Sequence, residues 1–249
     1  MTVAPRSRSG GPAVIVTASA LKRYAACAAI ALLLAACGPR EPVSRAPVDQ
    51  APSVAPADAV SYRLVPGESE IRILAYRDGP LASLGHNHVI STTVIDGVLA
   101  LASPVGRSTV RLAFPVQSLE IDIPAQRREE GDDFPGELDQ SAIDGTRSNM
   151  LGEKLLDAVS YPEVSLRSRE ITGELPELRL LMDVSVRDQV VAIEIPVTVT
   201  SGDGQLVASG EATVRQTDLG LQPFSVGLGA LSVRDELELK FRLVARPGG

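Results

Sequence analysis

Cysteine is almost absent from this chain of 249 residues, which contains only Cys27 and Cys37. Both lie close to the N-terminus, so the rest of the chain has no thiol for a disulfide, a nucleophile or a metal ion. Tryptophan is missing, and aromatic residues make up only 3% of the chain, too few for stacking on bases or sugars. Because 44% of the residues are hydrophobic, we expect a folded domain that is held together by an aliphatic core.

Positive charge and catalytic motifs are also scarce. The 24 Lys and Arg residues are outnumbered by 31 Asp and Glu residues, which gives a net charge of −7 at pH 7. No basic stripe could neutralise a phosphate backbone, so nucleic acid is not expected as a partner. The sequence has no Gly-x-Ser-x-Gly elbow, no Gly-x-Gly-x-x-Gly motif and no phosphate-binding loop. We therefore expect no cofactor and no enzymatic activity.

The N-terminus indicates export. Lys22 and Arg23 precede the apolar run YAACAAIALLLAAC, which is too short to span a membrane and ends in small residues. Its last four residues, LAAC, resemble the lipobox of bacterial lipoproteins. The resemblance implies a signal peptide over residues 1–36 and acyl chains on Cys37 that attach the protein to a membrane. An ordinary signal peptide with a chance cysteine is the alternative.

Gly38 bears on which membrane carries the protein. By the same resemblance, glycine in place of aspartate after the lipidated cysteine favours the outer membrane. We therefore expect a lipid-anchored protein of the cell envelope that faces the periplasm.

Residues 37–60 form the predicted tether between this anchor and the domain. Pro, Ala and polar residues alternate here without apolar periodicity. A polyproline-like spacer rises about 3.1 Å per residue, so the tether would hold the domain up to roughly 70 Å from the membrane. Loss of residues 1–36 removes four basic residues and no acidic one, which changes the net charge from −7 to −11. The exported protein is therefore distinctly acidic.

Short segments with a period of two dominate residues 61–249, the predicted domain. Apolar residues occupy every second position in the segments 71–75, 110–116, 178–186, 191–199 and 237–243. The sequence SGDGQ at 201–205 predicts a tight hairpin turn. An open sheet of this length would expose two edges. We therefore predict an all-β fold, an antiparallel β-barrel of about eight strands.

One long connection, residues 123–162, lacks this alternation. A helix is predicted at about residues 148–157, with Leu151 and Leu155 on one face and a role in plugging one barrel end. An acidic cluster precedes the helix, formed by Glu129, Glu130, Asp132 and Asp133. The cluster lacks the ligand spacing of an EF-hand calcium loop, so a solvated loop is the favoured interpretation.

His86 and His88 are the only histidines of the chain. On a strand, residues i and i+2 point to the same face, so the two imidazoles are predicted to project together from one wall of the barrel. A hydrogen-bonding pair at the mouth of a pocket is the favoured interpretation. A metal site is the alternative, but zinc needs three or four ligands and only a carboxylate such as Asp78 could add to the pair.

An ordered series of motifs between Tyr62 and Arg246 resembles the YceI-like family of lipid- and polyisoprenoid-binding proteins. The motifs are YRLVPGESEIRI (62–73), SLGHNHVISTTVIDGVLAL (83–101), STVRLAFPVQSLEID (108–122), KLLDAVSYPEVSLRS (154–168) and ATVRQTDLGL (212–221). The resemblance implies an extended lipocalin-like barrel that holds a polyisoprenoid or another long apolar lipid inside. An eight-stranded barrel is wide enough to enclose one slender ligand of this kind.

The ligand is expected to contact inward-facing side chains and the histidine pair. The predicted contacts are Phe114, Met182, Val184, Ile193, Phe241, His86 and His88. Two other functions stay open at this point. The protein could be a metal-binding periplasmic protein or enzyme that uses His86 and His88, or a ligand-free structural protein of the envelope whose barrel is filled by its own side chains. The domain is expected to be a monomer or a weak homodimer.

Overall fold

Sheet pairing joins the strands of the domain into one antiparallel sheet. The structure is a computed structural model that describes residues 1–2 and 55–248. Cys37, the tether up to residue 54 and the predicted signal peptide beyond Thr2 therefore lie outside the described residues.

The strands are β1 (Val60–Leu64), β2 (Glu70–Asp78), β3 (His88–Thr92), β4 (Asp96–Leu101), β5 (Thr109–Pro115), β6 (Glu120–Ile121), β7 (Glu163–Glu174), β8 (Glu177–Val186), β9 (Gln189–Gly202), β10 (Gln205–Arg215), β11 (Ser225–Val226) and β12 (Leu231–Pro247).

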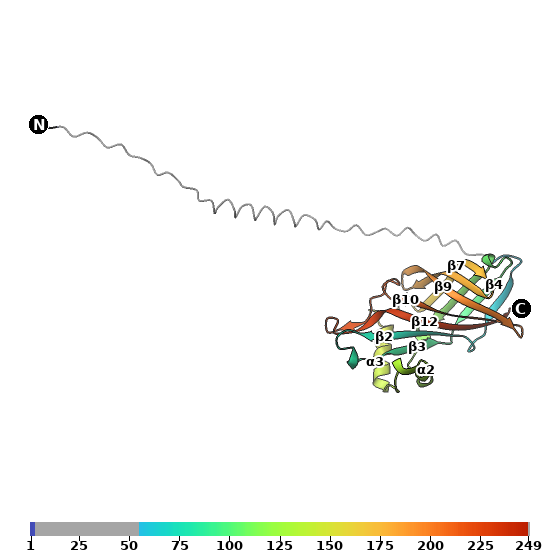
Figure 1. Cartoon of the computed structure of the whole chain (residues 1–249), viewed down its shortest axis with the longest axis horizontal. Coiled ribbons are helices and arrows are strands. Elements are labelled where there is room, and N and C mark those ends of the chain that lie inside the picture. The colour runs from blue at the N-terminus through green and yellow to red at the C-terminus, as the bar shows by residue number, and fades with distance from the viewer. Residues whose placement is uncertain (3–54, 249) are drawn as a thin grey trace. The chain divides into compact units, whose positions relative to one another are not determined.

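Eight of these strands close into a barrel. Their order is β1-β4-β5-β7-β8-β9-β10-β12, and β12 pairs with β1 to complete the ring. The long strand β12 also pairs with β2, and β3 and β6 follow β2 in the sheet (Figure 1). The predicted all-β fold, a lipocalin-like antiparallel barrel of about eight strands, is confirmed.

The strand patterns confirm which side chains face inward. On β8, the five alternate residues from Leu178 to Val186 are all buried, as expected for a strand with one dry face. The predicted hairpin at residues 201–205 joins β9 to β10, and its turn places Asp203 and Gly204 at φ values of 52° and 74°. A turn with two consecutive positive φ values matches the twist of the flanking strands.

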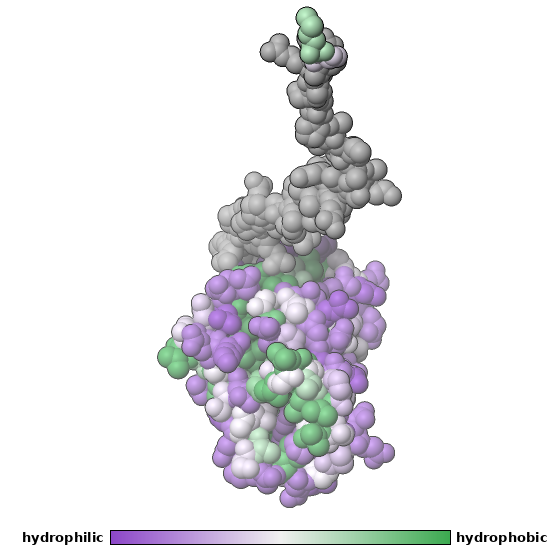
Figure 2. Space-filling model, turned by 90° about the vertical axis from the view of Figure 1, so that its left-hand side faces the viewer, coloured by the Kyte–Doolittle hydropathy of each residue, from purple (hydrophilic) through white to green (hydrophobic). Residues whose placement is uncertain are grey.

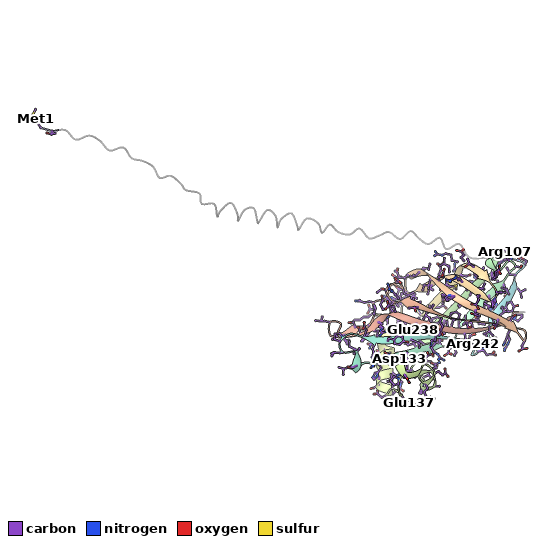
Figure 3. All side chains as sticks on the ribbon, viewed as in Figure 1. Met1, Arg107, Asp133, Glu137, Glu238 and Arg242 are labelled. Carbon is purple, nitrogen blue, oxygen red and sulfur yellow. The ribbon has the colours of Figure 1, made fainter. Side chains whose placement is uncertain are left out.

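The barrel has two ends, which differ in what covers them. The β1 end carries the start of β1, the β7–β8 turn and the β9–β10 turn. Arg107 lies at this end (Figure 3), where its guanidinium forms an ion pair of 2.8 Å with Asp58. The opposite end, called the α3 end here, carries the β8–β9 turn and the β11–β12 hairpin. Helix α3 (Gln140–Leu151) lies on that side of the domain (Figure 1).

The prediction of a helix at residues 148–157 is wrong in its position, because the helix of this connection spans Gln140–Leu151. Helix α3 begins eight residues earlier, because Asp139 caps it by accepting a hydrogen bond of 2.9 Å from the Ala142 amide. The helix ends at Leu151, Gly152 follows it, and turns occupy most of the rest of the predicted range. Three residues of α3 face the barrel interior, Thr146, Asn149 and Met150, in keeping with the predicted plug.

A second, smaller apolar cluster lies on the outer face of β2 and β3. Leu74 and Val89 point away from the barrel interior and pack against Phe134. Phe134 directly follows helix η5 (Gly131–Asp133), which in turn follows helix α2 (Pro124–Glu129). This covering segment, residues 123–136, is therefore attached to the barrel wall and is not a free loop.

The interpretation of the whole acidic cluster as a solvated loop is wrong for Glu130. Its side chain is only 5% exposed and forms ion pairs with Arg72 at 2.7 Å and Lys240 at 2.5 Å. Glu129 contacts the same Arg72 at 3.0 Å but is 62% exposed. Asp133 lies on the covering segment, on the same side of the domain as Glu238 and Arg242 of β12 (Figure 3). Glu130 thus joins the covering segment to β2 and β12.

Glu130 makes the stability of the domain sensitive to acid. Burial raises the pKa of Glu130, but the hydrogen bonds from Lys240 and Arg72 outweigh it and hold the pKa below its ordinary value. A lowered pKa in the folded state stabilises the fold above the unfolded pKa of about 4.3, and this contribution is lost as the pH falls through the folded pKa. Urea unfolding at a series of pH values should therefore show a smaller loss of stability on acidification for Glu130→Gln than for the wild type. Glu129→Gln, the exposed neighbour, should follow the wild type, and equal pH profiles for all three proteins would contradict this role.

Strands β9 and β10 pair along only part of their length. Pairing joins Thr198–Gly202 to Gln205–Ser209 and stops there, although β9 continues on its other edge to pair with β8 as far as Gln189. At the point of separation, a Cβ added to Gly210 would lie 2.3 Å from the Pro196 carbonyl oxygen. The Pro196 carbonyl therefore faces β10. The N–H and C=O of a strand residue point to the same side, so an N–H at this position would also have faced β10, and proline has none. From this point toward the α3 end the two strands are not paired, and we call this unpaired stretch between β9 and β10 the seam.

No helix among the described residues is long and apolar enough to cross a membrane.

Candidate ligand-binding site

Two apolar cavities follow one another inside the barrel. Cavity 1, of about 270 Å³, lies toward the α3 end, and cavity 2, of about 130 Å³, lies toward the β1 end. They adjoin, because four residues line both: Ile71, Leu166, Ile195 and Leu239. The interior is therefore hollow along much of its length, whereas alternation in the sequence is equally compatible with a solid core.

Most of the predicted contact residues line these cavities. Phe114, Val184 and Ile193 line cavity 1, together with His88. Met182 and Phe241 line cavity 2. These side chains project inward because each occupies an alternate position on its strand.

His86 does not belong to the cavity lining. It precedes β3 and is exposed, while His88, the first residue of β3, is 14% exposed and faces cavity 1. The two rings lie 6.4 Å apart between centroids. The prediction that both project together from one wall is wrong, since the strand that would align them starts only at His88. Within the described ranges, no group of three or more His, Cys, Asp and Glu residues is placed to hold a metal ion.

His88 is fixed by a buried carboxylate. Its Nδ1 lies 2.7 Å from Oδ2 of Asp122, a residue with a side chain that is fully buried. The other oxygen of Asp122 accepts hydrogen bonds from the Val89 amide at 3.0 Å and from Arg127 at 2.6 Å. Burial raises the pKa of Asp122, but the hydrogen bonds from His88, Val89 and Arg127 outweigh it and keep the pKa below its ordinary value.

Arg127 belongs to the covering segment and is itself only 1% exposed. Besides Asp122, its guanidinium donates hydrogen bonds to the carbonyl oxygens of Asn87, Pro135 and Gly136. Asp122 therefore connects the outer covering segment to a histidine that faces the barrel interior.

Other polar groups lie close to His88 in cavity 1. The Thr146 hydroxyl lies 3.5 Å from Nε2 of His88 and donates a hydrogen bond of 2.9 Å to the Ala142 carbonyl. The order Thr-His-Asp is that of a nucleophilic triad, but the hydroxyl proton is directed to the helix backbone and not to the imidazole. This arrangement is suited to hydrogen bonding with a ligand.

Sequence reasoning missed Asp122, Arg127 and Thr146. Asp122 ends the motif STVRLAFPVQSLEID, but nothing in the sequence indicates that a residue 34 positions after His88 contacts it. Arg127 lies in the connection over residues 123–162, where no periodic pattern indicates which side chains are buried. For Thr146, the sequence does contain a signal. Asp139 is a helix-capping residue, and recognising it would have placed Thr146 on a helix.

The α3 end also exposes large aliphatic side chains. The region between β2 and β3 contributes Leu81 and Leu84, which are 46% and 71% exposed, and the β11–β12 hairpin contributes Leu228, which is fully exposed. A hydrogen bond of 2.8 Å from the Leu81 amide to the Ala230 carbonyl holds the two segments together. Figure 2, which views the domain from its left in Figure 1, shows hydrophobic surface gathered among polar residues.

The fold and the cavities define the class of this protein, a lipocalin-like barrel with an apolar interior. The chain belongs to the YceI-like family, because the model of the YceI-like domain matches residues 62–245. Barrels of this family bind apolar ligands. The likeness predicted from sequence motifs is confirmed.

A solved structure shares the fold. BcnA from Burkholderia cenocepacia aligns with a TM-score of 0.54 at 13% sequence identity, over 73% of this chain and 98% of BcnA. A YceI protein from Campylobacter jejuni aligns with a TM-score of 0.45 at 10% identity, over 62% of this chain and 82% of that protein. A search of curated proteins finds no match to this chain.

Proposed function

We propose that this protein is an envelope-anchored binding protein that holds a polyisoprenoid or another long apolar lipid inside its barrel. The observation that carries the proposal is the pair of adjoining cavities, which together form an elongated apolar space. A flexible aliphatic chain fits such a space. Burial stabilises its complex by about 0.8 kcal/mol for each methylene group.

The lining supports binding more than catalysis. Cavity 2 is lined almost wholly by aliphatic side chains. Three polar side chains of cavity 1, those of His88, Thr146 and Gln216, already form hydrogen bonds with groups outside the lining. A long chain bound here needs few polar contacts, because the apolar contacts supply most of the binding free energy.

Anchoring follows in this proposal from Cys37. Several acyl chains on one residue give lasting membrane attachment. The domain would then be held in the periplasm at the outer membrane, at the end of the Pro- and Ala-rich tether.

One fractionation experiment tests both parts of the proposal. The full chain and Cys37→Ala are expressed in a Gram-negative host, membranes are separated from soluble proteins, and each purified protein is analysed by native mass spectrometry and lipid extraction. We expect the wild type in the membrane fraction. Cys37→Ala should be found either as soluble protein or as protein that retains its signal peptide, and an apolar lipid should be bound to both proteins. Equal partitioning would refute the anchor, and ligand-free protein that also fails to take up added isoprenoid would refute the binding function.

A further inference from the structure

The lining of cavity 1 is apolar apart from four polar residues. Among the residues that the structure describes, those lining this cavity include no Lys, Arg, Asp or Glu. The polar members are His88, Thr146, Asn149 and Gln216, and Gln216 donates its amide to the Arg234 carbonyl at 2.7 Å. A charged ligand head would therefore lose its hydration at this site without gaining an opposite charge from the lining.

The tautomer of His88 follows from its partner. The lowered pKa of Asp122 keeps the carboxylate ionised, and an ionised carboxylate can only accept, so Nδ1 of His88 carries a proton. Arg127 already balances the charge of Asp122 through a 2.6 Å ion pair. In the tautomer with its proton on Nδ1, the imidazole of His88 presents Nε2 as a hydrogen-bond acceptor toward Thr146 and cavity 1.

Thr146 adds a second acceptor at the same place. Its hydroxyl proton is used in the hydrogen bond to Ala142, which leaves lone pairs on Oγ1. Nε2 of His88 and Oγ1 of Thr146 lie 3.5 Å apart, beyond a good hydrogen bond between them. A hydroxyl placed between these two atoms could donate to one of them.

We propose that cavity 1 selects apolar chains that end in an uncharged hydroxyl, an isoprenoid alcohol for example, over the same chains ending in phosphate or carboxylate. The hydroxyl donates to His88 Nε2 or Thr146 Oγ1, and the chain extends through cavity 1 toward cavity 2. This inference rests on the proposed function and specifies its ligand class.

Arg187 is the residue that an anionic head would use instead. It lies in the turn after Val186, donates to the Leu155 carbonyl at 3.2 Å, and its Nε is buried without a hydrogen-bond partner among the described residues. Its guanidinium lies 5.5 Å from the centre of the Tyr161 ring. Arg187 does not line cavity 1, although its neighbours Val186 and Leu155 do.

Three ligands with one chain and different heads separate these alternatives: farnesol, farnesyl phosphate and the hydrocarbon farnesene. Each is titrated into delipidated protein that lacks residues 1–37, since the described residues 55–248 belong to a compact unit with its own core. We expect the wild type to bind farnesol about tenfold or more tightly than the other two ligands. Farnesene cannot form the buried hydrogen bond, and farnesyl phosphate would have to lose the hydration of its charge. His88→Ala should reduce the preference for farnesol over farnesene to less than about threefold.

His86→Ala is the matched control, because it removes the exposed histidine and should leave the preference unchanged. Thr146→Val keeps the His88–Asp122 pair and its fold, and should lower the affinity for farnesol while leaving that for farnesene unchanged. Equal or tighter binding of farnesyl phosphate by the wild type, lost in Arg187→Gln, would overturn the hydroxyl preference and leave the proposed function in place. Failure of all three ligands, including farnesene, to bind would overturn both.

Discussion

Asp122→Ala is expected to lower the free energy of unfolding by about 3–5 kcal/mol, the range measured when one partner of a buried ion pair is removed. The substitution leaves Arg127, which is 1% exposed, without its counter-charge, and His88 without its hydrogen-bond partner. Urea denaturation followed by circular dichroism at neutral pH measures the loss. Asp132→Ala is the matched control, because Asp132 is exposed on the covering segment and should change stability by less than about 0.5 kcal/mol.

A double variant separates the charge from the rest of the effect. Asp122→Ala with Arg127→Met removes both charges and should recover a large part of the stability lost in Asp122→Ala, because no uncompensated charge stays buried. If Asp122→Ala costs less than about 1 kcal/mol, the carboxylate does not hold the covering segment to the barrel wall, and the environment assigned to Arg127 is wrong.

Ala208→Phe is expected to set an upper limit on the length of chain that the barrel accepts. Ala208 is buried on β10 and lines cavity 2, so the added ring should occupy much of the 130 Å³ at the β1 end. A chain that loses burial of about four methylene groups loses about 3 kcal/mol, which is about a hundredfold in affinity. Competition binding with isoprenoid alcohols of increasing length should therefore show loss of the long members and retention of the short ones.

Thr213→Phe provides the control, since it adds the same ring to the outer face of the same strand. It should leave the length profile unchanged. Equal weakening of short and long chains by Ala208→Phe would show that ligands do not pass from cavity 1 into cavity 2. Destabilisation by about 1–3 kcal/mol with no change in binding would instead indicate that the region around Ala208 is already fully packed.

The sequence predicted the barrel because the signal for a strand is local. Every second residue from Leu178 to Val186 is apolar, and this pattern is set by burial on one face alone. The same regularity could not distinguish a cavity from a solid core, because the volume of the interior depends on how all the strands are spaced around it. Val184 and Ile193 were therefore predicted to face inward, while the space beside them was not.

The polar part of the site was largely beyond sequence reasoning. The contact between His88 and Asp122 depends on the pairing of β3 with β6, a ladder of only two residue pairs. The burial of Glu130 depends on Arg72 and Lys240, which lie 58 and 110 positions away in the chain. Charge in a non-periodic connection favours a solvated loop unless such distant partners are known. The helix error was different in kind, because the cap at Asp139 is local and could have been recognised.

Because of the seam between β9 and β10, the barrel wall should move outward more easily around cavity 1 than around cavity 2. Around cavity 2, the ladders from β8 through β9 and β10 to β12 run without a register shift, so we expect that a wider ligand would have to break hydrogen bonds to enter. Around cavity 1, β9 and β10 have already separated beyond Pro196, and the wall can widen there without losing a ladder bond. We thus expect the wall at the α3 end to move outward for a bulky or branched group, and the β1 end to admit only a slender chain. We therefore expect size discrimination in this barrel to be graded along its axis, from tolerant at the α3 end to strict at the β1 end.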